Sequence, residues 1–220
     1  MVPLICAIIV ILYRGFWYNK NMFKSENEIT VQLKCSAAEL ARQLEAEGYR
    51  RGDVFQMDDF YFVPKDLKLG ELSPREILSR AVLVREIEDM EKKEYTRKLT
   101  FKIKEINPEG EILNQTAINC TVYNIEEAKN FLEAIGYAEL MEIKEAGCVY
   151  WDGEFGVAIK DVKGGDTLIE IETSEEYDTI QKLISRLEQT TIPYFKDDYF
   201  VKKAEVELER KDRYFRINSR

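Results

Sequence analysis

Alternating apolar and polar positions run through most of the chain and predict strands. In residues 28–34, Ile29, Val31 and Leu33 alternate with polar residues, and this period of two is typical of a strand with one face in water. The pattern recurs at 98–106, where Leu99 and Phe101 alternate with lysine and threonine. Further strands are predicted at 54–63, 81–87, 112–123, 141–144, 149–151, 156–162 and 167–172.

Helix start signals stand between the predicted strands. Ser36 with Glu39 and Ser73 with Glu76 have the spacing of a capping box, in which each side chain accepts a hydrogen bond from the other residue's backbone N–H at a helix start. Asn124 can cap another helix. The sequence therefore predicts helices after Ser36, Ser73 and Asn124, and two more at about 175–188 and 197–208.

Two nearly identical segments indicate an internal repeat. LEAEGY at 44–49 and LEAIGY at 132–137 both follow a predicted strand and a helix cap, and both lead into another strand. Gly48 and Gly136 stand where a glycine commonly ends a helix. The repeat predicts one domain built from two similar halves.

Charged residues recur along one face of several strands, for example Lys98, Lys102 and Lys104 on one strand and Glu170 and Glu172 on another. One interpretation is an open antiparallel sheet with one face in water. The other is a closed barrel whose charged face lines a tunnel. Both signs of charge recur in mid-strand on strands that are distant in sequence, and this favours the barrel. About eight mostly antiparallel strands with a few helices indicate an α+β fold.

The composition excludes several kinds of catalysis and metal binding. The 220 residues include no histidine, which excludes catalysis by a serine–histidine or cysteine–histidine pair and any histidine-ligated zinc. There are 32 Lys and Arg against 41 Asp and Glu, a formal net charge of −9, which argues against sequence-independent binding of nucleic acid. The four cysteines form no C-x-x-C pair, as is typical of reduced thiols in a cytoplasmic protein.

The N-terminus carries the one long apolar run, VPLICAIIVILY at 2–13. It is shorter than the roughly 20 residues that span a membrane, and it lacks the basic start and cleavage site of a signal peptide. Three interpretations remain: translation starts at Met22 and the segment is not native, residues 2–18 form an interfacial anchor with Trp17 and Tyr18, or the segment is a buried strand or helix. We favour a start at Met22, and expect membrane contact only through residues 2–18.

Four motifs occur in a characteristic order. Arg85 stands in LVREI, Lys102 in LTFK and Lys144 in the IK that follows the second repeat, and VKGGDTLIEIE at 162–172 places an E-x-E pair after a glycine-rich turn. Together they resemble the CYTH superfamily, the triphosphate tunnel metalloenzymes. The resemblance covers a domain at 25–205, between an N-terminal segment 1–24 and a charged tail 206–220. It implies an antiparallel, eight-stranded, closed or nearly closed β-barrel with helices packed outside.

The opening strand departs from the E-x-E-x-K motif of this family. In the register that we prefer, 30–34, Lys34 is retained directly before a helix cap, but Thr30 and Gln32 replace both carboxylates. A shifted register, 26–30, keeps Glu26 and Glu28 and loses the lysine. Three further family positions also differ: an arginine is replaced by Leu83, another by Ala146, and the aspartate before the glycine-rich turn by Lys160.

The resemblance implies a site in which basic residues hold phosphates and carboxylates hold a metal. A triphosphate carries about four negative charges, which several lysines and arginines must offset. Mg²⁺ or Mn²⁺ prefers carboxylate oxygens and usually keeps several waters. The implied phosphate ligands are Lys34, Arg85, Lys102 and Lys144, the implied metal ligands are Glu170 and Glu172, and the implied catalytic acids are Glu28, Glu170 and Glu172.

These residues predict binding, with at most weak divalent-metal-dependent hydrolysis, of a triphosphate or polyphosphate compound inside the barrel. The alternative is a non-catalytic relative kept as a binding or scaffold module, which the missing first-strand carboxylates favour. If the chain is an enzyme, we expect a phosphohydrolase rather than an adenylyl cyclase. A membrane-tethered sensor using residues 2–18 is a third hypothesis. The substrate stays open because one fold serves many substrates, and so does the oligomeric state.

Overall fold

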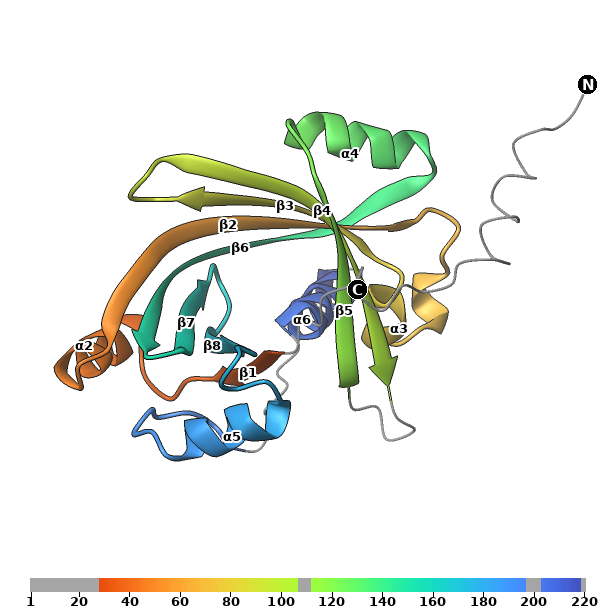
Figure 1. The fold of residues 1–220 in the computed structure, drawn as a ribbon. Coiled ribbons are helices and arrows are strands. Elements are labelled where there is room, and N and C mark those ends of the chain that lie inside the picture. The colour runs from red at the N-terminus through yellow and green to blue at the C-terminus, as the bar shows by residue number, and fades with distance from the viewer. Residues whose placement is uncertain (1–27, 107–111, 197–202, 219–220) are drawn as a thin grey trace, which may run out of the picture.

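The computed structural model describes residues 28–106, 112–196 and 203–218 (Figure 1). The apolar segment at 2–13 and both candidate starts, Met1 and Met22, lie outside these ranges. Among the described helices, none combines the length and apolar character that crossing a membrane requires.

Eight antiparallel strands form one strongly curled sheet. The strand order is β1-β8-β7-β6-β2-β3-β4-β5, so β1 and β5 are the edges, and the described residues form no ladder between them. The sheet is thus a barrel whose closure is incomplete, which confirms the predicted α+β fold. The strands are β1 (Glu28–Gln32), β2 (Arg50–Pro64), β3 (Val82–Asp89), β4 (Glu94–Ile106), β5 (Ile112–Thr121), β6 (Tyr137–Asp152), β7 (Phe155–Val162) and β8 (Thr167–Glu172).

The two repeated segments occupy equivalent places in the fold. LEAEGY ends helix α2 (Ala37–Ala46) and leads into β2, whereas LEAIGY ends helix α4 (Ile125–Ala134) and leads into β6. Gly48 and Gly136 have φ values of 90° and 97°, a conformation that glycine adopts without steric cost. Strands β2 and β6 pair antiparallel along most of their length, so the centre of the sheet joins the two halves. Figure 1 shows both strands arching over β7, β8 and β1.

The other helices are η1 (Leu69–Glu71), α3 (Pro74–Leu78), α5 (Ile180–Glu188) and α6 (Lys203–Asn218). Both predicted capping boxes form, at Ser36 and at Ser73. Helix α5 begins later than the predicted residue 175, because the side chain of Thr179 caps it by accepting a hydrogen bond from the backbone N–H of Lys182. Helix α6 lies later than the predicted 197–208, and the domain boundary that we drew at residue 205 falls inside it.

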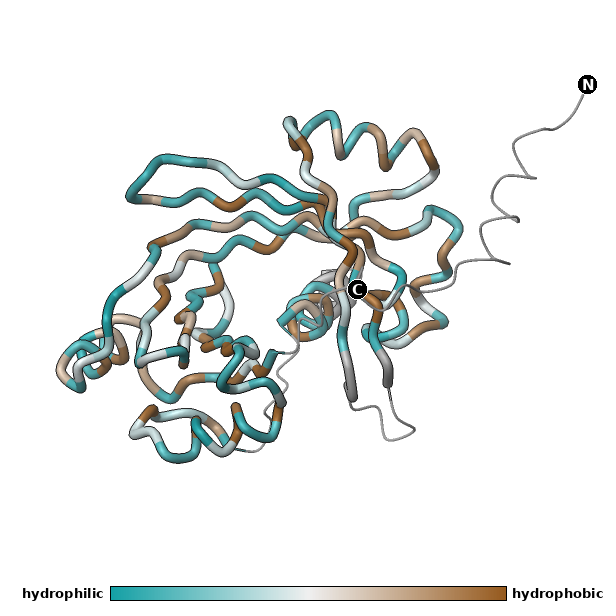
Figure 2. Tube along the Cα trace, in the orientation of Figure 1, coloured by the Kyte–Doolittle hydropathy of each residue, from teal (hydrophilic) through white to brown (hydrophobic). Residues whose placement is uncertain are grey.

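The outer face of the sheet is covered by α2, α4 and α5. Figure 2 shows hydrophobic residues alternating with hydrophilic ones along the strands. The apolar side of β1, with Ile29 and Val31 fully buried, packs with Leu44 of α2 and Leu183 of α5. Helix α4 packs through Leu132 and its neighbours against β2 and β3. Since the apolar residues of β1 face α2 and α5, its alternate polar residues must face the inside of the curl.

Helices α3 and α6 close one end of the concave side. Ile77 of α3 and Leu208 of α6 join Met141 and Ile143 of β6 in a buried apolar cluster. Leu208 is 4% exposed, so residues beyond 205 contribute to the core. The start of α6 thereby reaches the space enclosed by the sheet.

Candidate functional site

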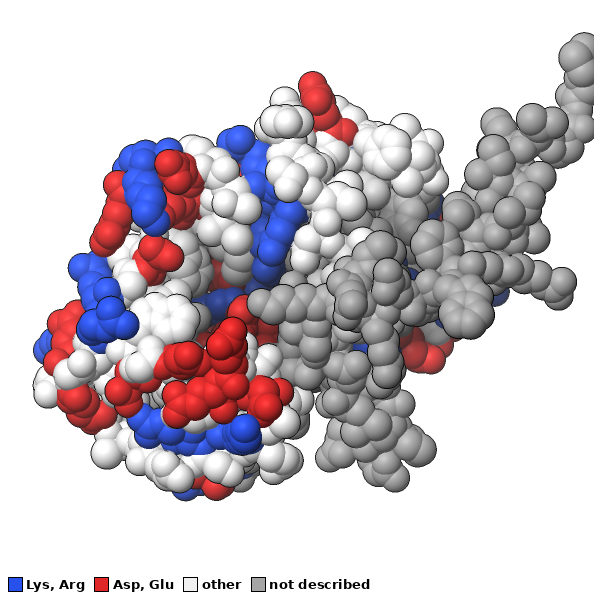
Figure 3. Space-filling view, in the orientation of Figure 1, with Lys and Arg blue, Asp and Glu red and all other residues white. Residues whose placement is uncertain are grey.

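A cavity of about 130 Å³ lies inside the curl of the sheet. It is lined by residues of seven strands, all but β6, and by residues of α3, α5 and α6. In the space-filling view, basic and acidic atoms meet in the hollow enclosed by the sheet (Figure 3). The polar and charged lining residues are Glu28, Thr30, Tyr61, Arg85, Thr100, Lys102, Lys104, Gln115, Lys160, Glu170, Lys203 and Glu205.

Three predicted acids come together, two of which, Glu28 and Glu170, line this cavity, whereas Glu172 is exposed beside them. One carboxylate oxygen each from Glu28, Glu170 and Glu172 lies within 4.8 Å of the other two. The antiparallel pairing of β1 with β8 causes this, because it sets Glu28 opposite Glu172 and Thr30 opposite Glu170. Clustered carboxylates are the donor set that Mg²⁺ and Mn²⁺ prefer, so the residues fit a divalent cation.

The polar face of β1 faces the cavity, but Lys34 does not reach it. Glu28 and Thr30 line the cavity, whereas Ile29, Val31 and Leu33 are buried on the other side. Lys34 lies beyond the end of β1 and is exposed, with its ammonium group 4.9 Å from the centre of the Phe195 ring. Helix α2 starts so soon after β1 that Lys34 belongs to the connection, outside the cavity.

The other predicted phosphate ligands divide into two groups. Arg85 on β3 and Lys102 on β4 both line the cavity. Lys144 on β6 does not, and its ammonium group instead pairs with Asp58 at 3.1 Å and Glu142 at 2.9 Å. Successive residues of a strand point to opposite faces, so when Glu145 points inward, Lys144 must point outward.

Four charged residues that the sequence analysis did not select form a buried network with Arg85 and Glu170. Asp59 accepts hydrogen bonds of 2.6 and 2.8 Å from Arg85 and lies 3.3 Å from the ammonium group of Lys203. Lys203 also donates to Glu145 at 2.6 Å, and Lys160 donates to Glu170 at 2.6 Å. Opposite charges therefore alternate in the order Arg85, Asp59, Lys203, Glu145, Lys160 and Glu170.

Only part of this network left a signal in the sequence. Asp58 and Asp59 are adjacent in a predicted strand, so one of them had to face inward. Lys160 was visible as a departure from the family pattern. Lys203 left no signal, because its partners Asp59 and Glu145 are remote in sequence.

The network shifts the pKa of Glu170, Asp59 and Lys160. Burial acts to raise the pKa of Glu170, but the ammonium groups of Lys160 and Lys102 outweigh it and lower the pKa to about 2. The carboxyl of Asp59 also titrates below its usual range, because Arg85 and Lys203 outweigh its burial. The pKa of Lys160 is raised despite burial, owing to Glu170 and Glu145. All of these groups are charged at neutral pH.

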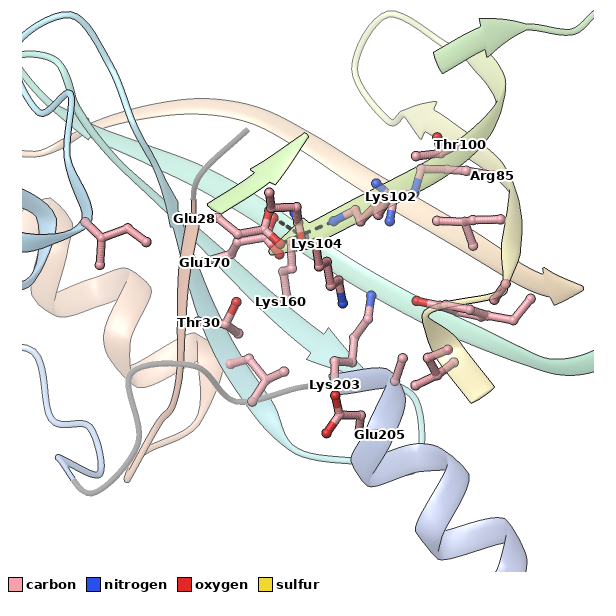
Figure 4. Close-up of a pocket in the computed structure, with 18 residues that line it drawn as sticks. Glu28, Thr30, Arg85, Thr100, Lys102, Lys104, Lys160, Glu170, Lys203 and Glu205 are labelled. Carbon is pink, nitrogen blue, oxygen red and sulfur yellow. Dashed lines mark hydrogen bonds and ion pairs between the residues drawn. The ribbon is translucent and has the colours of Figure 1, made fainter. Parts of the chain in front are cut away.

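Lys104 differs from the other cations of the cavity. Figure 4 shows Lys102, Lys104, Lys160 and Lys203 converging on the space between β1, β4 and α6. Lys102 lies 3.3 Å from Glu28, whereas no hydrogen bond or ion pair of Lys104 occurs within the described ranges. Burial, together with the Lys102 ammonium group, lowers the pKa of Lys104. Glu205 and Glu28 act on this ammonium group electrostatically but form no ion pair with it. A partly desolvated ammonium group that makes no ion pair within the described ranges is suited to bind an anion.

Comparison with known proteins identifies the fold. No family model matches the chain, and no curated protein matches it. Among solved structures, it is similar to PH1819 from Pyrococcus horikoshii OT3, with 16% identity, a TM-score of 0.61 and coverage of 84% of this chain and 99% of that one.

Two further structures have names that refer to an activity. One is a candidate adenylate cyclase from Vibrio parahaemolyticus, with 14% identity, a TM-score of 0.54 and coverage of 85% of this chain and 98% of that one. The other is HpAC1 from Hippeastrum, a candidate adenylyl cyclase described as revealing a dominant triphosphatase activity, with 14% identity, a TM-score of 0.53 and coverage of 84% and 96%. At this identity the likeness shows the fold alone: the chain has the same fold as these three structures.

Proposed function

We propose that this protein binds a triphosphate or other polyphosphate compound, together with a divalent cation, in the cavity of the curled sheet. The observation that carries the proposal is that two acids of a carboxylate cluster, Glu28 and Glu170, and a group of lysine and arginine side chains face the same enclosed space. The triphosphatase activity described for HpAC1, on the same fold, supports the choice of ligand.

The carboxylates Glu28, Glu170 and Glu172 would hold Mg²⁺ or Mn²⁺. A divalent cation at such a site supplies charge neutralisation of phosphate oxygens and polarises the phosphorus that a water attacks. The three clustered carboxylates carry charge of the same sign and repel one another, so a cation bound between them lowers this repulsion.

The phosphates would be held by Lys102, Lys104 and Arg85. Lys104 is available without breaking an ion pair within the described part of the chain. Arg85 uses Nε and Nη2 to bind Asp59, which fixes the guanidinium plane and leaves Nη1 without a hydrogen bond among the described residues. Arginine held in this way can donate to a phosphate oxygen in a fixed direction. Lys34 and Lys144 lie outside the cavity and take no part in the proposal.

Binding is better supported than turnover. Thr30 stands opposite Glu170, and in the register 30–34 it replaces the first carboxylate of the family's first-strand motif. Lys160 places a positive charge 2.6 Å from Glu170, which opposes the approach of a metal ion. These two positions support slow hydrolysis at most, and they favour a non-catalytic binding module as the second candidate function.

Calorimetric titration tests the proposal directly. Inorganic triphosphate, thiamine triphosphate and ATP are titrated with Mg²⁺ and with Mn²⁺, and phosphate release is measured in parallel. We expect metal-supported binding of at least one compound, unchanged in Lys144→Met and weakened at least about tenfold in Lys102→Met. If none of the compounds binds and none is hydrolysed, the proposal fails.

A further inference from the structure

Lys160 supplies a cation of the chain itself to one acid of the carboxylate cluster, Glu170. Its ammonium group donates to Glu170 at 2.6 Å, and its side chain is only 8% exposed. Glu170 is also one of the three acids that could hold a metal ion. One carboxylate is therefore shared between an internal cation and a candidate metal position.

A second acceptor for the same ammonium group lies close by. Oε1 of Glu145 is 3.5 Å from the Lys160 nitrogen, and it is a fully buried oxygen with no hydrogen bond among the described residues. The other oxygen of Glu145 accepts a hydrogen bond from Lys203. A buried carboxylate oxygen without a hydrogen bond is costly, so Glu145 retains the capacity to accept one more.

We propose that Lys160 competes with a divalent cation for Glu170, and that Glu145 is the second acceptor to which the ammonium group of Lys160 moves when Glu170 binds the cation. The two acceptors give Lys160 two positions on one side of the cavity, each satisfied by a carboxylate. If the ammonium group lost Glu170 and had no second acceptor, it would stay buried and unpaired. The free-energy cost would then be several times that of moving to Glu145. This inference rests on the proposed function, because it concerns the metal affinity of the same site.

The proposal predicts changes of opposite sign in Mn²⁺ affinity when Lys160 is removed and when Glu145 is weakened as an acceptor. Lys160→Met removes the internal cation and leaves Glu170 free. This variant should bind Mn²⁺ at least about tenfold tighter than the unmodified protein, because a like charge a few ångströms away strongly opposes the binding of an ion. Weakening the second acceptor holds Lys160 on Glu170, so Glu145→Gln should bind Mn²⁺ severalfold more weakly. In the double variant the effect of Glu145→Gln should disappear, because no lysine remains to be moved.

Direct Mn²⁺ binding, followed by electron paramagnetic resonance and calorimetry without any phosphate compound, tests the inference. Lys163→Met, on the exposed turn after β7, is the matched control and should leave Mn²⁺ affinity unchanged. If Lys160→Met does not fold, the double variant of Lys160→Met and Glu145→Gln is used, because it removes one charge of each sign. The difference in Mn²⁺ affinity between the double variant and Glu145→Gln alone then measures the effect of Lys160.

The outcomes distinguish the competition by Lys160 from the proposed metal site itself. Tighter Mn²⁺ binding on loss of Lys160, with an effect of Glu145→Gln that depends on Lys160, supports the inference. If the unmodified protein binds Mn²⁺ and loss of Lys160 changes its affinity by less than about twofold, the inference is overturned while the proposed metal site stands. If none of the variants nor the unmodified protein binds Mn²⁺, both the metal part of the proposed function and the inference are overturned.

Discussion

Lys203, the first residue of helix α6, donates a hydrogen bond of 2.6 Å to Glu145 on β6. The same ammonium group lies 3.3 Å from Asp59 on β2, and both acids are fully buried. The start of α6 is thus attached to the centre of the sheet by charge, while Leu208 attaches the next turns through apolar packing.

Loss of this attachment should destabilise the fold. In Lys203→Met two buried carboxylates lose one of their cationic partners, although Asp59 keeps Arg85 and Glu145 keeps Lys160. We expect the free energy of unfolding in urea to fall by about 3 kcal/mol. Lys211→Met, at an exposed position of the same helix, is the control and should change it by less than about 0.5 kcal/mol. Equal stabilities of the two variants would contradict the structural role of Lys203.

The carboxyl of Glu170 should make stability depend on acidic pH. Its pKa is lowered to about 2 from an ordinary value of 4.5, because Lys160 and Lys102 outweigh its burial. A lowered pKa contributes stability that is fully present above the ordinary value and is lost as the pH falls through the folded value. Urea unfolding of the unmodified protein should therefore show falling stability from about pH 5 to about pH 2, and Glu170→Gln should show a smaller slope in this window. Identical slopes would show that Glu170 is not held by its lysine partners.

The position of each lysine should decide its effect on ligand affinity. Lys104→Met removes a cavity ammonium group and should weaken binding of inorganic triphosphate at least about tenfold. Lys34→Met removes a lysine that lies outside the cavity and should leave the affinity unchanged. Calorimetric titration in the presence of Mg²⁺ measures both. An equal loss in the two variants would indicate general electrostatic attraction and not a built site.

Restoring carboxylates on β1 should separate an enzyme from a binding module. Thr30 lies opposite Glu170 and lines the cavity, so Thr30→Glu adds metal-binding oxygens to the existing cluster. Gln32→Glu, on the same strand and opposite Leu168, is combined with it to restore the second carboxylate of the motif in the register 30–34. We expect tighter Mn²⁺ binding and faster release of phosphate from inorganic triphosphate than in the unmodified protein. Hydrolysis that appears only in this variant would identify the natural protein as a binding module.

The control for this variant is Thr96→Glu, which adds a carboxylate at an exposed position of β4. It should leave Mn²⁺ affinity and phosphate release as they are in the unmodified protein. If the β1 variant behaves like this control, Thr30 does not stand at a metal position.

The sequence by itself determined the elements of the fold. The alternation of Ile29, Val31 and Leu33 with polar residues predicted β1, because residues of a strand that pack under a helix must recur at every second position. Capping at Ser36 and Ser73 predicted two helix starts, since these bonds involve residues only three positions apart. The repeated segments predicted the equivalence of α2 with α4.

Only the tertiary structure decided which charged residues share the cavity. Lys144 and Glu145 are adjacent in sequence, and the face that each occupies depends on the direction in which β6 curls. Lys34 follows β1 so closely that strand and connection could not be told apart without the pairing of β1 with β8. Lys203 meets Asp59 and Glu145 because α6 returns to the sheet, a contact between residues remote in sequence that no local pattern encodes. Local hydrogen bonds and periodicity act over a few residues, whereas the charge balance of a cavity is set by long-range packing.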